Sequence, residues 1–531
     1  MPKRGPPQVQ RWFQERPSRH PWEQDGLDHV RRLMPNAEPY RACATFSFTA
    51  PSGRINECDL LVAVPGGLHL VELKGHPGRV VNHDDTWLFR PPNSGRTLTL
   101  RNPLHLVDLK SKELRGRLDW AATQLRLGVG TIPRVEPSIF LSAPGLRADL
   151  DEVQRTRVYG RDEQCEGLPW IWRDLLSRPP QRESQRITPE FSRNLLALLQ
   201  KAGLSVSTAH LRFGDNWTLD PELLDAGPTW EDRLAQRRDP VREQGRVRIY
   251  LTAQQAIPEV RQSVERAARR EYQVLQGINH RGIVQAVQIA QHQGGPAILF
   301  RHRAEDLRLD SYLAVHGERL TPEIRLDLVR QLGEALRYAH GRSLYHRALA
   351  ARSIYVSARD DGSEPVLRVI DWQAAARDFD TTGAPSAGLA SAGHTSLGHT
   401  SLGHTWLSDT HLADAAEVYL APEFDVPYAD PVDLDMFGLG AVAYLIITGQ
   451  PPATNRSGLI ERLRAEGGLH PYAVTDGVSA ALDELVHHAT RADIAGRLDS
   501  PEAFLDGLDD AERDSVVPEP AGVDPLTASA G

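Results

Sequence analysis

The sequence contains few cysteines, few aromatic residues and no long apolar run. Its three cysteines, Cys43, Cys58 and Cys165, are scattered and lack the spacing of a metal site. This excludes a disulfide-stapled secreted scaffold and indicates a reducing compartment, so we expect a cytoplasmic protein. No signal peptide is expected, because no apolar run follows the first residues, MPKRGPP. We find no stretch of about 18 apolar residues and therefore expect no membrane span.

An excess of positive charge is also lacking. Lys and Arg number 61 and Asp and Glu number 70, which gives a formal net charge of −9. A general basic surface for nucleic acid is thereby excluded, whereas a local basic groove stays open. The apolar share of 40% and the charged share of 25% are ordinary for a globular protein. A chain of 531 residues is too long for one hydrophobic core, so we expect two or three domains.

Residues 20–160 are predicted to form a first domain. Its clearest feature is a pair of apolar runs, 54–64 and 68–75, separated by Pro-Gly-Gly, which predict a β-hairpin. Glu72 and Lys74 share one face of the second strand, and the turn brings Asp59 of the first strand near Glu72. Carboxylates suit Mg²⁺, which could polarise a phosphodiester, with Lys74 orienting the attacking water. The simpler alternative is a solvated salt bridge on a strand edge.

This arrangement resembles the D…E-x-K core of the restriction-endonuclease-like nucleases. The segments NECDLLV (56–62) and VELKG (71–75) look, more narrowly, like the nuclease-related domain called NERD. The resemblance implies a restriction-endonuclease-like α/β fold and DNA as a possible partner. It also implies Asp59, Glu72 and Lys74 as catalytic residues, with Asp59 and Glu72 binding a Mg²⁺ cofactor. Glu23 lies where that family often has a further acidic residue.

Two features around this domain are less specific. The glutamine-bearing motif of many relatives has no evident counterpart in 102–112, so nuclease activity stays a hypothesis. In that segment Lys110 and Lys112 could touch phosphate or, more simply, lie on a solvated helix face. Residues 161–215 are predicted to be a helical connector, because Thr188 and Pro189 begin a leucine-faced helix that Gly203 ends.

The segment 216–507 contains the strongest motifs, which are His346-Arg347-Ala348, Ser353, Asp371-Trp372-Gln373, Tyr419-Leu-Ala-Pro-Glu423 and Arg497. They resemble the H-R-D-x-x-x-x-N, D-F-G and A-P-E motifs of protein kinases. The apolar segment 435–452 is similar to the central buried helix of that family. The resemblance implies a bilobal protein-kinase-like fold, ATP as a ligand, Asp371 as a metal ligand and an ion pair between Glu423 and Arg497.

Several residues that act on phosphate in that family are replaced here. Ala348 cannot accept the substrate proton, and losing such a base typically costs about 10²–10⁴ in rate. Ser353 replaces the metal-binding asparagine, Tyr250 replaces the strand lysine, and the glycine-rich turn is reduced to one glycine and a proline. The lysine's usual partner, Glu271, is kept. Arg248 shares a strand face with Tyr250, so we hypothesise that Arg248 pairs with Glu271, with a solvated Glu271 as the alternative.

Three segments are expected to be flexible. They are 1–19, an insert at 381–416 in the activation segment, and an acidic, Pro- and Ala-rich tail at 508–531. The tail ends as a linker would, which suggests a missing downstream region. The insert repeats GHTSL, so its histidines recur every five residues. They could bind a metal, although a recently duplicated loop is the simpler interpretation.

A nuclease-related domain fused to a kinase-like domain resembles the bacterial phage-growth-limitation (BREX-type) serine/threonine kinases. The resemblance implies a role in phage defence, with other proteins of that system as partners. The leading hypothesis is a pseudokinase that senses nucleotide or acts as a scaffold, with nucleotide near Arg248, Glu271, Ser353 and Asp371. The alternatives are a metal-dependent nuclease regulated by the kinase-like domain and a kinase that is active through substitute residues. Substrate and oligomeric state stay open.

Overall fold

The computed structural model describes residues 11–14, 16–18, 20–92, 97–127, 132–180, 182–204, 209–227, 230–237, 241–252, 258–303, 305–357, 364–372, 376–377, 417–426 and 429–516. The chain divides into two compact units. The first comprises Met1–Arg266 and Ile289–Leu299, and the second comprises Ala267–Gln288 and Phe300–Gly531. The division passes through the kinase-like segment. Its first strands therefore belong to the same unit as the predicted hairpin of the first domain.

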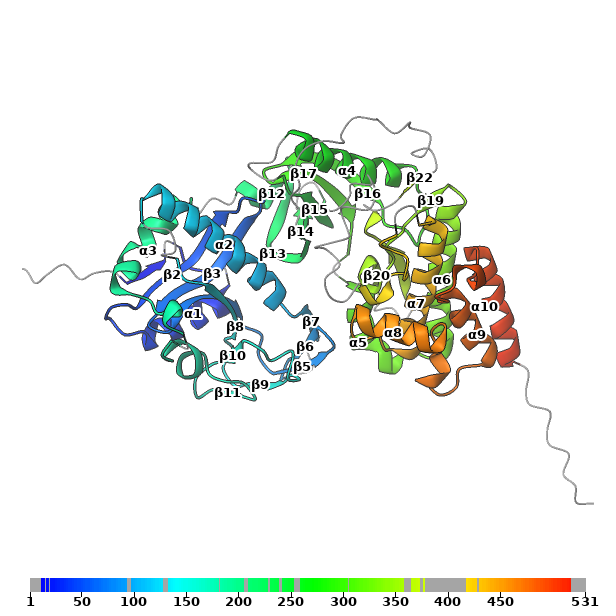
Figure 1. Ribbon diagram of the computed structural model, residues 1–531, viewed down its shortest axis with the longest axis horizontal. Helices are drawn as coiled ribbons and strands as arrows, with labels where there is room; N and C mark the ends of the chain where they lie inside the picture. The colour runs from blue at the N-terminus through cyan, green and yellow to red at the C-terminus, as the bar shows by residue number, and fades with distance from the viewer. Residues whose placement is uncertain are drawn as a thin grey trace, which may run out of the picture. The chain divides into compact units, whose positions relative to one another are not determined.

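A six-stranded mixed sheet forms the centre of the N-terminal domain (Figure 1). Its order is β1 (Trp12–Gln14), β2 (Arg41–Thr49), β3 (Ile55–Val64), β4 (Gly67–Lys74), β8 (Val135–Leu141) and β10 (Val158–Gly160). Strands β2, β3 and β4 are antiparallel, and the other pairings are parallel. The predicted hairpin is β3–β4, and its register pairs Leu60 with Val71. The adjacent position along this register brings Asp59 and Glu72 together.

Helices cover both faces of this sheet. The helix α1 (Pro21–Leu33) and a π-helical turn, η1 (Ile171–Leu176), share a core with Leu60. The helices α2 (Leu104–Gln124) and α3 (Pro189–Lys201) share a second core with Leu61. Neighbouring strand residues separate in this way because their side chains point to opposite faces. A Cβ on Gly26 of α1 would lie 2.6 Å from the Cβ of Ser142, so glycine permits the close approach of α1.

A second sheet of five strands extends the domain. Its order is β11 (Cys165–Glu166), β9 (Leu146–Asp149), β5 (Arg79–His83), β6 (Thr86–Arg90) and β7 (Leu98–Arg101). Trp87 and Phe89 of β6 are buried with Leu146 of β9 and with Ile139 of the first sheet. This shared core fixes the end of β7, and therefore Arg101, relative to the hairpin.

The segment 161–215 contains the predicted helix, which packs against the N-terminal domain. Thr188 accepts a hydrogen bond from the amide of Phe191 at 3.1 Å, Pro189 begins α3, and Gly203 follows it with φ +88°. Phe191 and Leu198 are buried in the core that α2 forms with the sheet. An apolar helix face must be covered, and here the sheet domain covers it. The segment is therefore a layer of the N-terminal domain.

The first strands of the kinase-like segment form another six-stranded sheet. Its order is β12 (Arg212–Phe213), β13 (Trp217–Gly227), β14 (Trp230–Arg237), β15 (Glu243–Tyr250), β17 (Gly295–Arg301) and β16 (Ala286–His292). The helix α4 (Pro258–Gln276) follows β15. Strands β13 and β14 are antiparallel, and their register pairs Gly227 with Trp230. Leu219, Ala235 and Val247 are among the core residues of this sheet.

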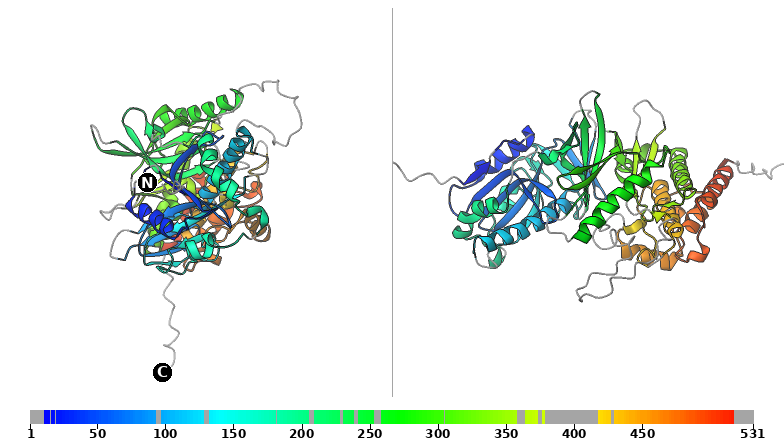
Figure 2. Two further views of the ribbon diagram at one scale, coloured as in Figure 1. Left: turned by 90° about the vertical axis from the view of Figure 1, so that its left-hand side faces the viewer. Right: turned by 90° about the horizontal axis from the view of Figure 1, so that it is seen from above.

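The second unit is mainly helical. It contains α5 (Leu309–His316), α6 (Pro322–His340), α7 (Pro431–Thr448), α8 (Arg456–Glu466), α9 (Ala480–Ala489) and α10 (Pro501–Val516). It also contains the short strands β18 (Asp306–Arg308), β19 (Leu344–Tyr345), β20 (Ile354–Ser357), β21 (Val366–Val369) and β22 (Ala376–Arg377). Helix α10 packs against α6 and α9 (Figures 1 and 2). A Cβ on Gly333 of α6 would lie 2.9 Å from the Cδ2 atom of Leu505 of α10, so a larger residue would make that side chain shift.

Helix α7 corrects one expectation about apolar runs. By length and composition it could cross a membrane, although 78% of its apolar window is buried inside the protein. Every residue from Leu434 to Ile447 is buried. An all-round apolar helix is what the centre of a folded lobe requires. The predicted central helix is therefore present, and it is the one described helix that meets the membrane-span criteria.

The expected tail also begins later than predicted. Helix α10 runs from Pro501 to Val516, so residues 508–516 are helical rather than part of a disordered tail. Leu508 and Ala511 are buried, which explains why the helix continues despite its acidic composition. The 381–416 insert with its GHTSL repeats, most of residues 1–19, and 517–531 lie outside the described residues.

Candidate functional sites

The structure brings the three predicted hairpin residues together. The carboxylate of Asp59 accepts the backbone amide of Leu73 at 2.7 Å. The Lys74 ammonium lies 3.5 Å from Glu72 Oε1. Burial raises the pKa of Asp59 well above its usual value, and the nearby Glu72 and Glu23 raise it further. Asp59 therefore gives up its proton less readily than a solvent-exposed aspartate.

Lys110 completes this cluster, although the sequence indicated a solvated helix face. Its ammonium lies 2.8 Å from Glu72 Oε2, whereas Lys112 is exposed and pairs with Asp108. Burial opposes the charge on Glu72, but Lys110 and Lys74 outweigh it and hold the pKa of Glu72 below its usual value. Helical spacing could have indicated this position: Lys110 lies three residues after Val107 and four before Leu114, which are both buried on α2.

The cluster as it lies does not fit a divalent cation well. Among the described residues, no group of three histidine, cysteine or acidic side chains is arranged to hold a metal ion. Both oxygens of Glu72 face lysine ammoniums, at 3.5 Å for Lys74 and 2.8 Å for Lys110. Two lysines thus supply the positive charge that Mg²⁺ would bring. The predicted Mg²⁺ site at Asp59 and Glu72 stays a prediction.

These residues line a cavity of about 250 Å³. Glu23 of α1 contributes to it, as the resemblance suggested, and its carboxylate accepts a hydrogen bond from Ser18 at 2.5 Å. Burial raises the pKa of Glu23. One wall comes from β13 of the kinase-like sheet, whose Glu222 carboxylate lies 2.6 Å from the Lys74 ammonium. No pattern within the first domain could have indicated Glu222, because it is 148 residues away from Lys74 in the chain.

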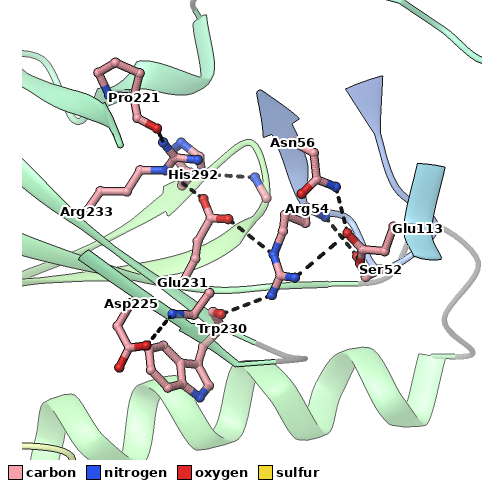
Figure 3. Close-up of polar contacts among 12 residues, drawn as sticks. Ser52, Arg54, Asn56, Glu113, Pro221, Asp225, Trp230, Glu231, Arg233 and His292 are labelled. Carbon is pink, nitrogen blue, oxygen red and sulfur yellow. Dashed lines mark hydrogen bonds and ion pairs between the residues drawn. The ribbon is translucent and has the colours of Figure 1, made fainter. Parts of the chain in front are cut away.

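A buried polar joint holds the kinase-like sheet against the N-terminal domain (Figure 3). Arg54, which is 2% exposed, lies between Glu113 of α2 and Glu231 of β14, at 3.9 and 3.6 Å. Its guanidinium also donates to the carbonyl of Trp230 at 3.4 Å. Glu231 in turn accepts a hydrogen bond from Arg233 at 2.9 Å. Side chains of the two domains therefore form one continuous network.

In the same sheet, Arg248 is engaged by an acidic residue that sequence reasoning did not identify. Its Nε and Nη2 each donate at 2.8 Å to the two carboxylate oxygens of Asp232, which Arg246 also contacts at 2.9 Å. Asp232 lies directly across from Arg248 in the β14–β15 register. Glu271 of α4 is fully buried. Arg248 and Glu271 belong to different units, so their predicted pairing stays a prediction.

The catalytic-loop region of the second unit is anchored by Asp435 of α7. This fully buried carboxylate accepts the backbone amides of His346 and Arg347 at 2.7 and 2.5 Å, and it lies 2.9 Å from His340. The ring of His346 contacts the Ile370 carbonyl at 2.8 Å, so His346 has a structural role here. An acidic residue within an apolar helix was a signal for this anchor, but only packing shows what it holds.

Of the residues that contact nucleotide or substrate in protein kinases, this region keeps Asp371 but replaces two others. Ala348 is 7% exposed and presents a methyl group where the family has its base. The Ser353 hydroxyl lies 3.5 Å from the Ala348 carbonyl. Asp371 keeps its carboxylate in a left-handed backbone conformation, with φ 64°, and lies 4.0 Å from the guanidinium of Arg308. Such backbone conformations in non-glycine residues cluster at functional sites.

The predicted ion pair of the large lobe is present. Arg497 donates to both carboxylate oxygens of Glu423, at 2.5 and 3.2 Å, and to the Asp433 carbonyl at 2.9 Å. The Arg497 side chain is fully buried and that of Glu423 is 11% exposed. A bidentate contact of this kind fixes the segment 417–426 against the helices.

Comparisons with known families agree with this geometry. Residues 18–142 match the nuclease-related domain, and residues 241–376 match the protein tyrosine and serine/threonine kinase family. The chain therefore carries a nuclease-related α/β domain followed by a protein-kinase-like fold, which was the predicted class.

One relative has both parts. Over 528 residues, which is 97% of this chain, the sequence is 39% identical to the probable kinase PglW of Streptomyces coelicolor. This similarity confirms the predicted resemblance to the bacterial phage-growth-limitation kinases. The chain spans about a third of the relative's length, at 32%.

Other similarities cover the kinase-like part. The serine/threonine-protein kinase PknJ of Mycobacterium tuberculosis is 27% identical over 44% of this chain and 36% of its own length. PknB of the same species is 26% identical over 48% of this chain and 39% of its own length. A solved PknI kinase domain is 19% identical, covers 58% of this chain and 99% of its own, and gives a TM-score of 0.39.

Proposed function

We propose that this protein is a phage-defence kinase homologue whose kinase-like fold senses nucleotide or acts as a scaffold. The observation that carries the proposal is that the catalytic loop keeps its structural contacts but lacks a catalytic base. Asp435 holds the backbone of His346 and Arg347, while Ala348 places a methyl group where a base would act. A methyl group cannot accept a proton, so phosphotransfer loses typically about 10²–10⁴ in rate from this change alone.

Nucleotide binding is the part of kinase function that this chain could retain. Asp371 offers a carboxylate suited to Mg²⁺, and Ser353 offers a weaker oxygen ligand. On β15, Tyr250 replaces the strand lysine and Arg248 is already neutralised by Asp232, which weakens the grip on the triphosphate. We therefore propose modest, Mg²⁺-dependent ATP binding, cytoplasmic action, and partners among other proteins of the same defence system.

The experiment is a thermal-shift titration of the whole chain with ATP, with and without Mg²⁺, beside a labelled-phosphate transfer assay. We expect ATP with Mg²⁺ to raise the unfolding midpoint, Asp371→Asn to abolish the rise, and no label to be transferred. Asp310→Asn, a change of the same type on α5, is the control. Label transfer that is lost in Asp371→Asn would instead establish an active kinase. No shift and no transfer would leave only the scaffold role.

A metal-dependent nuclease is the second candidate, and one observation favours it. Asp59, Glu72, Lys74 and Lys110 line one cavity, in which Glu72 lies 3.5 Å from Lys74 and 2.8 Å from Lys110. Divalent-cation-dependent cleavage of plasmid DNA that disappears in Glu72→Ala would support this activity. Cleavage that survives Glu72→Ala would assign it to a contaminant and exclude this site.

A further inference from the structure

The cavity of the nuclease-related domain is covered by an acidic stretch of β13. The Glu222 carboxylate lies 2.6 Å from the Lys74 ammonium, and Asp225 Oδ1 lies 3.8 Å from Arg101 Nη1. Both cations belong to the N-terminal domain, and both acids belong to one strand of the kinase-like sheet. Two acids of one strand thus each face a cation of the N-terminal domain, and Arg101 also pairs with Asp85 at 2.7 Å. This is the contact pattern of a linear polyanion.

The backbone of β13 is shaped so that Glu222 reaches Lys74. Strand β13 breaks register with β14 between Leu219 and Leu223, which forms a bulge at 220–222. Arg233 donates to the carbonyls of Asp220 and Pro221 at 3.1 and 2.7 Å. The amide of Glu222 donates to the Asp220 carboxylate at 2.9 Å. Bulges commonly redirect a side chain, and this one directs Glu222 out of the ladder.

The same bulge is held from behind by the interdomain joint. Arg233 is 2% exposed and is fixed by Glu231, which faces Arg54 of the N-terminal domain (Figure 3). The network therefore runs from Arg54 through Glu231 and Arg233 to the bulge. These contacts connect the bulge that carries Glu222 to the N-terminal domain.

The two partners of the covering contact differ in burial. The Lys74 side chain is 8% exposed, whereas that of Glu222 is 53% exposed. A half-exposed carboxylate can leave at small cost, because water replaces its partner. A buried ammonium cannot be left without an anion, because an uncompensated buried charge is costly. Lys74 keeps Glu72 at 3.5 Å when Glu222 leaves, so Glu222 is an exchangeable second anion for Lys74.

We propose that the Asp220–Asp225 segment is an intramolecular competitor for a single-stranded nucleic acid whose phosphodiester groups would contact Lys74 and Arg101. The segment covers the cavity in the described conformation, and nucleic acid binds when the bulge withdraws. This inference concerns the N-terminal domain and does not depend on nucleotide binding by the kinase-like fold.

The test measures binding of a short fluorescein-labelled single-stranded oligodeoxynucleotide to the whole chain by anisotropy, over a range of salt concentrations. We expect Glu222→Gln to bind roughly tenfold more tightly than the wild type, as expected for freeing one charge-assisted contact. The slope of log K against log salt should steepen by about one ion. Glu243→Gln, which removes a charge outside the cavity, is the control and should bind like the wild type.

The gain must also depend on the cavity cations. In the Glu222→Gln background, Lys74→Met should remove the increase, and Arg101→Gln serves the same purpose if the lysine variant does not fold. Equal binding by Glu222→Gln and Glu243→Gln would overturn the proposal. A gain that survives loss of either cation would also overturn it, as would the absence of binding by Glu222→Gln with an unchanged unfolding midpoint.

Discussion

Replacing Arg54 by methionine tests whether the polar joint stabilises the N-terminal domain and the kinase-like sheet as one body. The change removes a 2% exposed guanidinium that contacts Glu113, Glu231 and the Trp230 carbonyl. Breaking a buried pair by removing one partner costs roughly 3–5 kcal/mol, because a charge is left uncompensated. Glu231 keeps Arg233 at 2.9 Å, so we expect a loss at the lower end, about 3 kcal/mol.

The loss is best measured by native-state hydrogen exchange, because a chain with two compact units does not unfold as one two-state system. Amides in β3, β13 and β14 should lose protection together in Arg54→Met. Arg79→Met is the matched control: Arg79 pairs with Asp149 but its side chain is 52% exposed. An exposed pair is worth at most about 1 kcal/mol.

A double variant, Arg54→Met with Glu231→Gln, separates the pair from simple loss of packing. Removing both charges should recover part of the stability, because the uncompensated carboxylate is gone. If Arg54→Met changed protection no more than Arg79→Met does, the joint would be a passive contact and the reasoning would be refuted. If only β3 lost protection, the two sheets would be independent.

Two further predictions concern the buried ion pair of Arg497 with Glu423 and the buried imidazole of His69. Arg497→Met should destabilise the second unit by roughly 3–5 kcal/mol, because the 11% exposed carboxylate of Glu423 loses its bidentate partner; unchanged hydrogen exchange in α7 would contradict this. Burial, with Arg157 nearby, lowers the pKa of His69 to about 4. Between these two pKa values His69 is protonated in the unfolded chain and neutral in the folded chain. The free energy of unfolding therefore decreases as pH falls from the unfolded pKa of His69 towards 4. Between pH 7 and pH 5 the loss should be roughly 2 kcal/mol, and His69→Gln should flatten the pH dependence of β4 protection; an equal slope in both proteins would exclude His69 as the cause.

Local pattern was sufficient for the elements and for part of each site. The Pro-Gly-Gly turn and period-2 alternation placed Asp59, Glu72 and Lys74 correctly in one cluster, and Thr188 with Pro189 marked the first turn of α3. The Glu423–Arg497 pair was implied by the resemblance to the protein-kinase motifs. In each case the partners are neighbours in sequence or belong to a motif with fixed separation.

The sequence by itself determined the succession of the two folds, the hairpin, and the absence of a carboxylate at position 348, because turns, alternation and residue identity are local properties. Only the tertiary structure decided which charges meet. Three contacts show this: Glu222 with Lys74, Lys110 with Glu72, and Asp232 with Arg248. No sequence motif identified Glu222 or Asp232, and Lys110 was expected to lie on a solvated helix face. Buried charges must find counter-charges wherever packing brings them, and that choice depends on the whole fold rather than on any single segment.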